Sequence, residues 1–168
     1  EDIAARVKGK GALFHVDAPQ AVGKVPLDLA RLPVDLLTLS GHKFHGPKGV
    51  GALFIRRGLR IRPLFPGHQE RERRGGTENV PAIVGLGKAA ELAGDRMADM
   101  SGVAALRDRL EAAIRAIPGT RVHGSGAPRL PNTTLAGFAG VDGEALLLKL
   151  GERGVCVSIG SACTTGRK

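Results

Sequence analysis

The chain has 168 residues, of which 42% are hydrophobic, so it is long enough to bury a core and too apolar to be disordered. Its 25 Lys and Arg against 16 Asp and Glu give a net charge of +9. No apolar run approaches the length of a membrane span, and no charged-then-apolar leader segment opens the chain. We therefore expect neither a membrane-spanning helix nor a secretory leader. Two cysteines cannot build a disulfide framework, which makes a reducing cytoplasm the expected compartment.

The positive charge is densest between Arg56 and Arg74, a stretch with seven arginines. Such a stretch could release counterions from a nucleic-acid backbone. However, Glu70 and Glu72 interrupt it, and Phe65 is the one aromatic residue there that could stack on a base. We therefore expect a solvated surface or a subunit contact, and no specific nucleic-acid binding.

The first third of the chain has short apolar segments separated by loops, a pattern typical of an α/β sheet. Apolar spacing at the start indicates the end of an amphipathic helix that stops at Gly9. The expected strands are residues 12–16, 34–39 and 49–55. Ligand chemistry is expected beyond the ends of such strands.

From Arg56 to Thr77 the composition is rich in Arg, Gly, Pro and Glu, which predicts a loop or extended arm with a domain boundary at its end. Apolar residues spaced by three and four from Ile83 to Ile117 predict one or two amphipathic helices. The smaller expected elements are a helix over 142–150 capped by Asp142 and strands at 121–123, 133–135 and 155–158. We therefore expect two domains, residues 1–77 and 78–168.

Ser40, Gly41, His42 and Lys43 directly follow the second expected strand and bring an amine, a hydroxyl and an imidazole together. A lysine in a partly desolvated site beside other positive groups becomes a nucleophile that can form a Schiff base with an aldehyde. Ser40, His42 and the backbone around Gly41 could hold a phosphate at the same time. From these residues alone, an exposed surface turn is the alternative.

Asp17 ends the first expected strand, 26 residues before Lys43. A carboxylate there could pair with a protonated pyridine nitrogen, and Gln20 could donate a hydrogen bond to a phenolic oxygen. The alternative for Asp17 is a cap or turn-forming residue before Pro19.

The two cysteines have different surroundings in the sequence. Cys156 alternates with valines in an expected strand, which predicts a small buried hydrophobic residue. Cys163 lies in the small-residue loop 160–166, which could carry a nucleophilic thiolate; an unreactive surface cysteine is the alternative. The histidines have no spacing typical of a metal site, so we expect none.

Four segments together resemble the cysteine desulfurases, which are class V, fold-type I enzymes that use pyridoxal phosphate. They follow the family's order and are residues 15–24, 40–49, 73–80 and 158–164. The resemblance implies an α/β fold: part of a transferase large domain with a mixed sheet and helices, followed by a small α+β domain that carries the cysteine loop.

The resemblance also implies how the cofactor is held. Lys43 would bind pyridoxal phosphate covalently, Asp17 would contact its pyridine nitrogen, and Gln20 its ring hydroxyl. Ser40 and His42 would contact its phosphate. Thr77 would reach the phosphate bound by the neighbouring subunit of a homodimer.

For the reaction, the resemblance implies that Cys163 takes sulfur from L-cysteine as a persulfide and leaves alanine, with Lys43 as the general base. An iron–sulfur scaffold protein or another sulfur acceptor, as in tRNA thiolation, would receive the sulfur. In another class V enzyme, an aminotransferase or selenocysteine lyase, Cys163 would be dispensable. A non-catalytic domain that binds through Arg56–Arg74 is the alternative outside the enzymes.

Members of the family are much longer than this chain. The resemblance therefore implies a central-to-C-terminal fragment without the upstream phosphate-binding loop and ring-stacking histidine, and without the downstream arginine that binds the substrate carboxylate. We expect the isolated chain to turn over cysteine poorly, because substrate, cofactor and base must be held in one geometry.

Overall fold

The computed structural model describes residues 2–160, which fall into two compact units. The first comprises the chain up to Leu106 together with Leu130–Thr133, and the second comprises Arg107–Arg129 and the residues from Thr134 onward. The boundary predicted after residue 77 lies within the first unit, and the division of the protein into domains stays a prediction. None of the helices in residues 2–160 is long and apolar enough to cross a bilayer.

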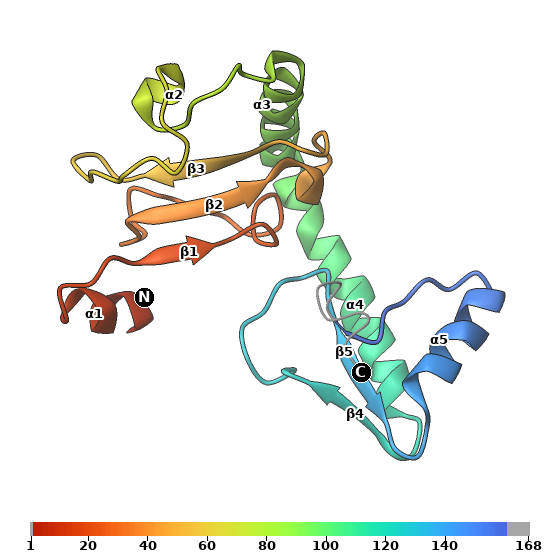
Figure 1. The fold of residues 1–168 in the computed structure, drawn as a ribbon. Helices are drawn as coiled ribbons and strands as arrows, with labels where there is room; N and C mark the ends of the chain where they lie inside the picture. The colour runs from red at the N-terminus through yellow and green to blue at the C-terminus, as the bar shows by residue number, and fades with distance from the viewer. Residues whose placement is uncertain (1, 161–168) are drawn as a thin grey trace. The chain divides into compact units, whose positions relative to one another are not determined.

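The first unit contains a three-stranded mixed sheet with β2 in the centre (Figure 1). Its strands are β1 (His15–Asp17), β2 (Leu36–Ser40) and β3 (Gly51–Ile55). β1 runs parallel to β2 and β3 runs antiparallel to it, which confirms the predicted α/β class with a mixed sheet. Each strand begins two or three residues later than predicted.

Buried residues around β1 and β2 fix the sheet. The hydrophobic core consists of Ala18, Val34 and Leu37. Next to it the buried Asp35 carboxylate accepts hydrogen bonds from Lys8 Nζ of α1 (Asp2–Lys8) and from the Phe14 backbone N–H, both at 2.8 Å. The Lys8 hydrogen bond is the main cause that lowers the pKa of Asp35, and the Phe14 N–H adds to it. These contacts tie α1 to the start of the two parallel strands.

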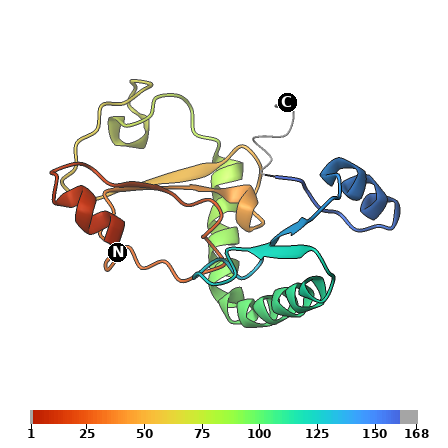
Figure 2. The same cartoon turned by 90° about the horizontal axis from the view of Figure 1, so that it is seen from below.

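The helix α3 (Val80–Asp95) packs against the loop that follows β2. Its N-cap is Asn79, whose side chain accepts a hydrogen bond from the Ala82 N–H at 3.3 Å. A Cβ atom at Gly85 would lie 2.6 Å from Pro47 Cγ, far inside an ordinary carbon contact. Glycine at this position therefore lets the helix backbone approach the loop. Figures 1 and 2 show α3 beside the end of the strands where the short helix η1 (Gly41–Phe44) lies.

The segment from 56 to 79 is mostly exposed and irregular, as its composition predicts, apart from the turn α2 (Gln69–Glu72). Its central part closes on itself. The Gly75 N–H donates to the Phe65 carbonyl oxygen at 2.7 Å, and the Gly76 N–H donates to Gln69 Oε1 at 3.0 Å. We call residues 65–76 the closed loop.

After α3, the turn η2 (Arg96–Asp99) leads into α4 (Met100–Arg115), so the segment predicted to form one or two amphipathic helices forms two helices. The second unit contains a two-stranded antiparallel sheet of β4 (Thr120–His123) and β5 (Leu135–Phe138). α5 (Gly143–Glu152) follows, and its predicted cap is confirmed because Asp142 Oδ1 accepts from the Ala145 N–H at 2.8 Å.

Glu111 of α4 is 1% exposed and belongs to the second unit. Arg129 donates two hydrogen bonds to its carboxylate, one of them 2.7 Å long, and Arg115 donates a third at 3.2 Å. The hydrogen bonding from Arg129 is the main cause that lowers the pKa of Glu111 to about 2. This ion cluster holds the loop between β4 and β5 on α4.

The strand predicted at 155–158 is wrong, and so is the burial of Cys156, which is exposed. Val155 and Val157 are 47% and 48% exposed. The Val155 N–H donates to the Leu150 carbonyl oxygen at 2.9 Å, so it caps the end of α5. Within residues 2–160 no other strand pairs with this segment, and an alternating apolar pattern cannot form a strand without a hydrogen-bonded neighbour.

Candidate active site

The carboxyl ends of the parallel strands β1 and β2 lie at one edge of the sheet, and Asp17 and Ser40 are their last residues. Asp17 is exposed and stands opposite Thr38 in the register. The Thr38 hydroxyl donates a 2.5 Å hydrogen bond to Asp17 Oδ1, which orients the carboxylate. This edge is where open α/β sheets bind their ligands.

The loop after β2 presents Lys43 at the same edge. Gly41 is buried, and a Cβ atom there would lie 3.1 Å from Leu86 Cδ1 of α3. Phe44 is only 4% exposed, whereas His42 and Lys43, between these two anchors, are exposed. The Gly46 N–H closes the turn by donating to the Gly41 carbonyl oxygen at 2.9 Å. The backbone is thus fixed while the lysine amine faces outward.

The polar groups at this edge fit the requirements of pyridoxal phosphate. Ser40 occupies the N-cap position of η1, yet its side chain makes no capping hydrogen bond, so the hydroxyl is available to an outside acceptor. His42 and Gln20 are both exposed and can donate hydrogen bonds. Together with the Lys43 amine and the Asp17 carboxylate they supply the groups that an aldehyde, a pyridine nitrogen, a ring hydroxyl and a phosphate need.

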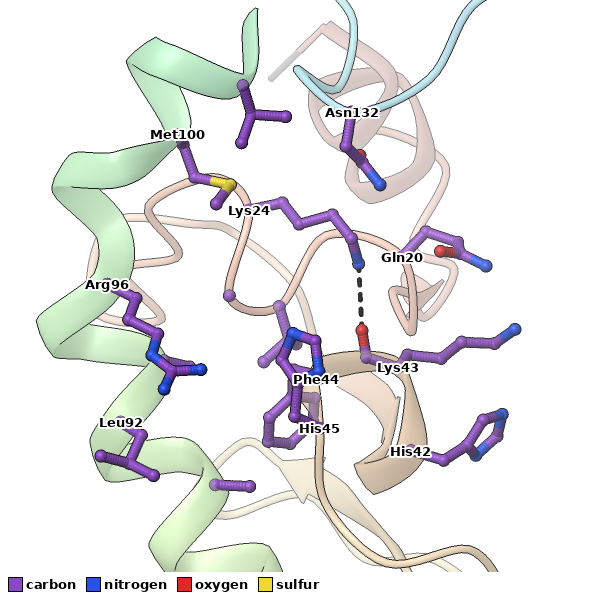
Figure 3. A pocket seen from close by; sticks show the side chains of 15 residues that line it. Gln20, Lys24, His42, Lys43, Phe44, His45, Leu92, Arg96, Met100 and Asn132 are labelled. Carbon is purple, nitrogen blue, oxygen red and sulfur yellow. Dashed lines mark hydrogen bonds between the residues drawn. The ribbon is translucent and has the colours of Figure 1, made fainter. Parts of the chain in front are cut away.

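A pocket of about 460 Å³ lies between the lysine loop and the segment from α3 to the start of α4 (Figure 3). In Figure 3 the side chains of Lys43, His42 and Gln20 extend away from Leu92 and Arg96 on the helix. All three residues line the pocket, on the side opposite the wall formed by the helix.

Sequence reasoning missed Lys24 and Thr38. The half-buried Lys24 Nζ donates a hydrogen bond to the Lys43 carbonyl oxygen at 3.2 Å. Burial is the main cause that lowers the pKa of Lys24, and the positive charge of Lys43 lowers it further. Thr38 could have been found as a hydroxyl two residues before the end of β2, but no local signal points to Lys24.

Two predicted site residues are not joined to this group. Thr77 is exposed on the segment from 56 to 79, and within residues 2–160 no hydrogen bond connects it to Asp17 or Lys43. Cys163 lies outside the described residues, so its predicted role stays a prediction. In the described part of the chain no three His, Cys, Asp or Glu side chains lie close enough together to hold a metal ion.

Comparison with known families shows a match to the model of the class-V aminotransferases over residues 1–167. The chain belongs to the aminotransferase class-V family. The class-V aminotransferases and the cysteine desulfurases among them depend on pyridoxal phosphate, so the predicted family and its cofactor are confirmed.

The similar class-V proteins include cysteine desulfurase 2 of Trichormus variabilis, which is 60% identical over 99% of this chain and 42% of its own length. A NifS-like protein from Rickettsia africae has a solved structure with a TM-score of 0.89, at 35% identity, covering 95% of this chain and 45% of its own. SspA, solved in complex with cysteine, is 33% identical with a TM-score of 0.72 and covers 98% and 45% of the two chains. The chain therefore spans less than half the length of each of these relatives.

Proposed function

We propose that the protein carrying this chain is a cysteine desulfurase that uses pyridoxal phosphate to remove sulfur from L-cysteine. The observation that carries the proposal is the common sheet edge of Asp17 and the Lys43 loop. The similarity of nearly the whole chain to cysteine desulfurases supports it. The cysteine complex of SspA supports the choice of substrate.

In this proposal the residues at the edge divide the work of holding the cofactor. The Lys43 amine binds the cofactor aldehyde, Asp17 pairs with the pyridine nitrogen, and Gln20 donates to the ring hydroxyl. Ser40 and His42 donate to the phosphate. When bound, pyridoxal phosphate supplies an aldehyde for amines and a ring that withdraws electrons from the substrate Cα.

Two side chains then act on the substrate. Lys43 Nζ would take the Cα proton of the substrate as general base. The Cys163 thiolate attacks the sulfur of the substrate, a new S–S bond forms, and the C–S bond breaks with its electron pair left on the substrate carbon. Protonation of that carbon and return of a proton to Cα give alanine, and Cys163 keeps the sulfur as a persulfide.

The test measures alanine and sulfide production by the whole protein with three single variants. Lys43→Ala is expected to lower the rates of alanine and sulfide production by about a hundredfold or more, because it removes both the covalent attachment of the cofactor and the general base. Cys163→Ser is expected to lose sulfide release while borohydride still fixes the cofactor to Lys43. Cys156→Ser is the matched control and is expected to stay within about twofold of wild type.

Undiminished sulfide production by Cys163→Ser would instead favour another class-V enzyme, an aminotransferase or selenocysteine lyase. Salt-sensitive binding of RNA or DNA, without cofactor binding, would favour a binding domain that uses Arg56–Arg74.

The proposal includes a homodimer in which Thr77 reaches the phosphate site of the partner subunit. Leu64 and Phe65, on the same segment as Thr77, are 84% and 58% exposed. Burying apolar side chains of this size against another subunit would stabilise the dimer. It also includes a small C-terminal domain within 78–168 that carries the cysteine loop. The persulfide sulfur would pass, in the cytoplasm, to an iron–sulfur scaffold or another sulfur acceptor.

A further inference from the structure

One long-range hydrogen bond joins the turn after β1 to the short helix η1 that carries Lys43. Lys24 Nζ donates a hydrogen bond to the carbonyl oxygen of Lys43 at 3.2 Å, across 19 residues of chain (Figure 3). Among residues 2–160 no other side chain hydrogen-bonds to the backbone of residues 41–44. The contact therefore fixes the main chain of the residue that carries the amine.

The contacted carbonyl belongs to a helix end that needs a partner. η1 is a four-residue 3-10 helix, and the last carbonyls of a helix have no partner within it. The Gly41 carbonyl oxygen accepts from the His45 and Gly46 N–H groups, which closes the turn from the inside. Lys24 supplies the corresponding donor for Lys43 from outside the helix.

The turn that carries Lys24 is itself held in place. Gly23 has a φ of +73°, and a Cβ atom there would lie 3.2 Å from Phe44 Cβ and 3.3 Å from Ala93 Cβ of α3. Its main chain is therefore packed against the buried aromatic residue of η1 and against the long helix. The Lys24 N–H also donates to the Ala21 carbonyl oxygen at 3.1 Å, so the backbone from which the Lys24 side chain extends is held in place.

The surroundings of Lys24 are unfavourable for its charge. Burial lowers the pKa of Lys24, and the charge of Lys43 lowers it further. Among the described residues that line the adjoining pocket there is no carboxylate. Within residues 2–160 no ion pair links Lys24 to a carboxylate, and the hydrogen bond to the Lys43 carbonyl oxygen is the polar contact that holds its ammonium group.

We propose that Lys24 is a positioning residue for Lys43: by holding the Lys43 carbonyl it fixes η1 so that the lysine amine faces the cofactor edge of the sheet. The inference rests on the proposed function, because it concerns how the cofactor-binding amine is presented. Lys24 acts through Lys43 and makes no contact with the cofactor or the substrate.

The first part of the test uses the whole protein without cofactor and measures amide hydrogen exchange at His45 and Gly46. Lys24→Met is expected to speed exchange at these amides by about tenfold, because the hydrogen bond that restrains the turn is lost. Lys24→Arg keeps a cationic donor and is expected to restore most of the protection. Lys88→Met is the matched control, since Lys88 is exposed on α3 and its one ion pair within residues 2–160 is with Glu91.

The second part measures covalent capture of pyridoxal phosphate by Lys43 after borohydride reduction, and non-covalent affinity in a Lys43→Ala background. Lys24→Met is expected to slow capture by about tenfold, because the amine is no longer held in the geometry of attack. In the Lys43→Ala background the same change is expected to alter cofactor affinity by less than about twofold.

The outcomes separate the two proposals. If Lys24→Met weakened cofactor affinity in the Lys43→Ala background as much as it slowed capture in the protein with Lys43, the inference would be overturned. Lys24 would then contact the cofactor or support the fold as a whole. Unchanged exchange at His45 and Gly46 in Lys24→Met would also overturn it. Absence of capture at Lys43 in the wild-type protein would refute the proposed function, while the exchange measurement would still decide the role of Lys24.

Discussion

Replacing Gly85 by alanine is predicted to leave the stability of the protein unchanged or to lower it, although the same change inside a helix normally raises it. Alanine in place of glycine in a helix interior gains about 1 kcal/mol. At Gly85 the new Cβ would lie 2.6 Å from Pro47 Cγ and 3.0 Å from Pro47 Cδ. Carbon atoms prefer roughly 3.5–4.0 Å, so α3 or the lysine loop must move by about 1 Å. Overpacking of this kind costs about 1–3 kcal/mol, which cancels or exceeds the gain.

Gly87 provides the control on the same helix, because a Cβ atom there would meet nothing within 4 Å. In urea denaturation, Gly87→Ala is expected to raise the free energy of unfolding by up to about 1 kcal/mol. The free energy of unfolding of Gly85→Ala is expected to be about 1–3 kcal/mol lower than that of Gly87→Ala. Movement of the loop that carries Lys43 is also expected to slow cofactor capture in Gly85→Ala by up to about a hundredfold. Equal stabilisation by both substitutions, with capture unchanged, would refute the packing argument.

Two further predictions concern the carboxylates described above. Thr38→Val removes the hydroxyl that orients Asp17 and is expected to weaken pyridoxal phosphate binding by about tenfold, while Thr38→Ser binds normally; equal affinities in an equilibrium titration would contradict this role. Because the pKa of folded Glu111 is lowered from 4.5 to about 2, its charge stabilises the fold fully above about pH 4.5, and this contribution is lost as the pH falls toward 2. Glu111→Gln is therefore expected to lower the urea midpoint at pH 7 and to match wild type near pH 2, and a difference that does not change with pH would count against the ion cluster.

Local sequence signals predicted the parts of the structure whose causes are local. Asp142 caps α5 because its side chain reaches an N–H three residues on, within the span that a sequence pattern covers. The cationic turn and glycine at the end of α1 are equally local. The candidate site could be outlined for the same reason, since Asp17 is the last residue of β1 and Lys43 lies in the short helix that follows β2.

Contacts between distant segments could not be predicted in the same way. The hydrogen bond from Lys24 to Lys43 depends on how the turn after β1 packs on η1, and no pattern near Lys24 encodes that. At Cys156 the sequence predicted a strand that does not form. Its alternating valines indicate a preference for extended backbone, but a strand also requires a neighbour, and the Val155 N–H bonds to the end of α5 instead.

The closed loop of residues 65–76 has a consequence for exchanging sequence between relatives. Its base is formed by its own atoms, because the two ends of the loop cross so closely that a side chain on Gly67 would collide with the backbone of Gly75, and one on Gly75 with the carbonyl group of Pro66. Lengthening a loop closed in this way costs little, since a doubling of length adds only about 0.6 kcal/mol of closure entropy. The residues between the two glycines can therefore be grafted, shortened or extended as a cassette while the three-stranded sheet keeps its register, provided that both glycines at the crossing are retained.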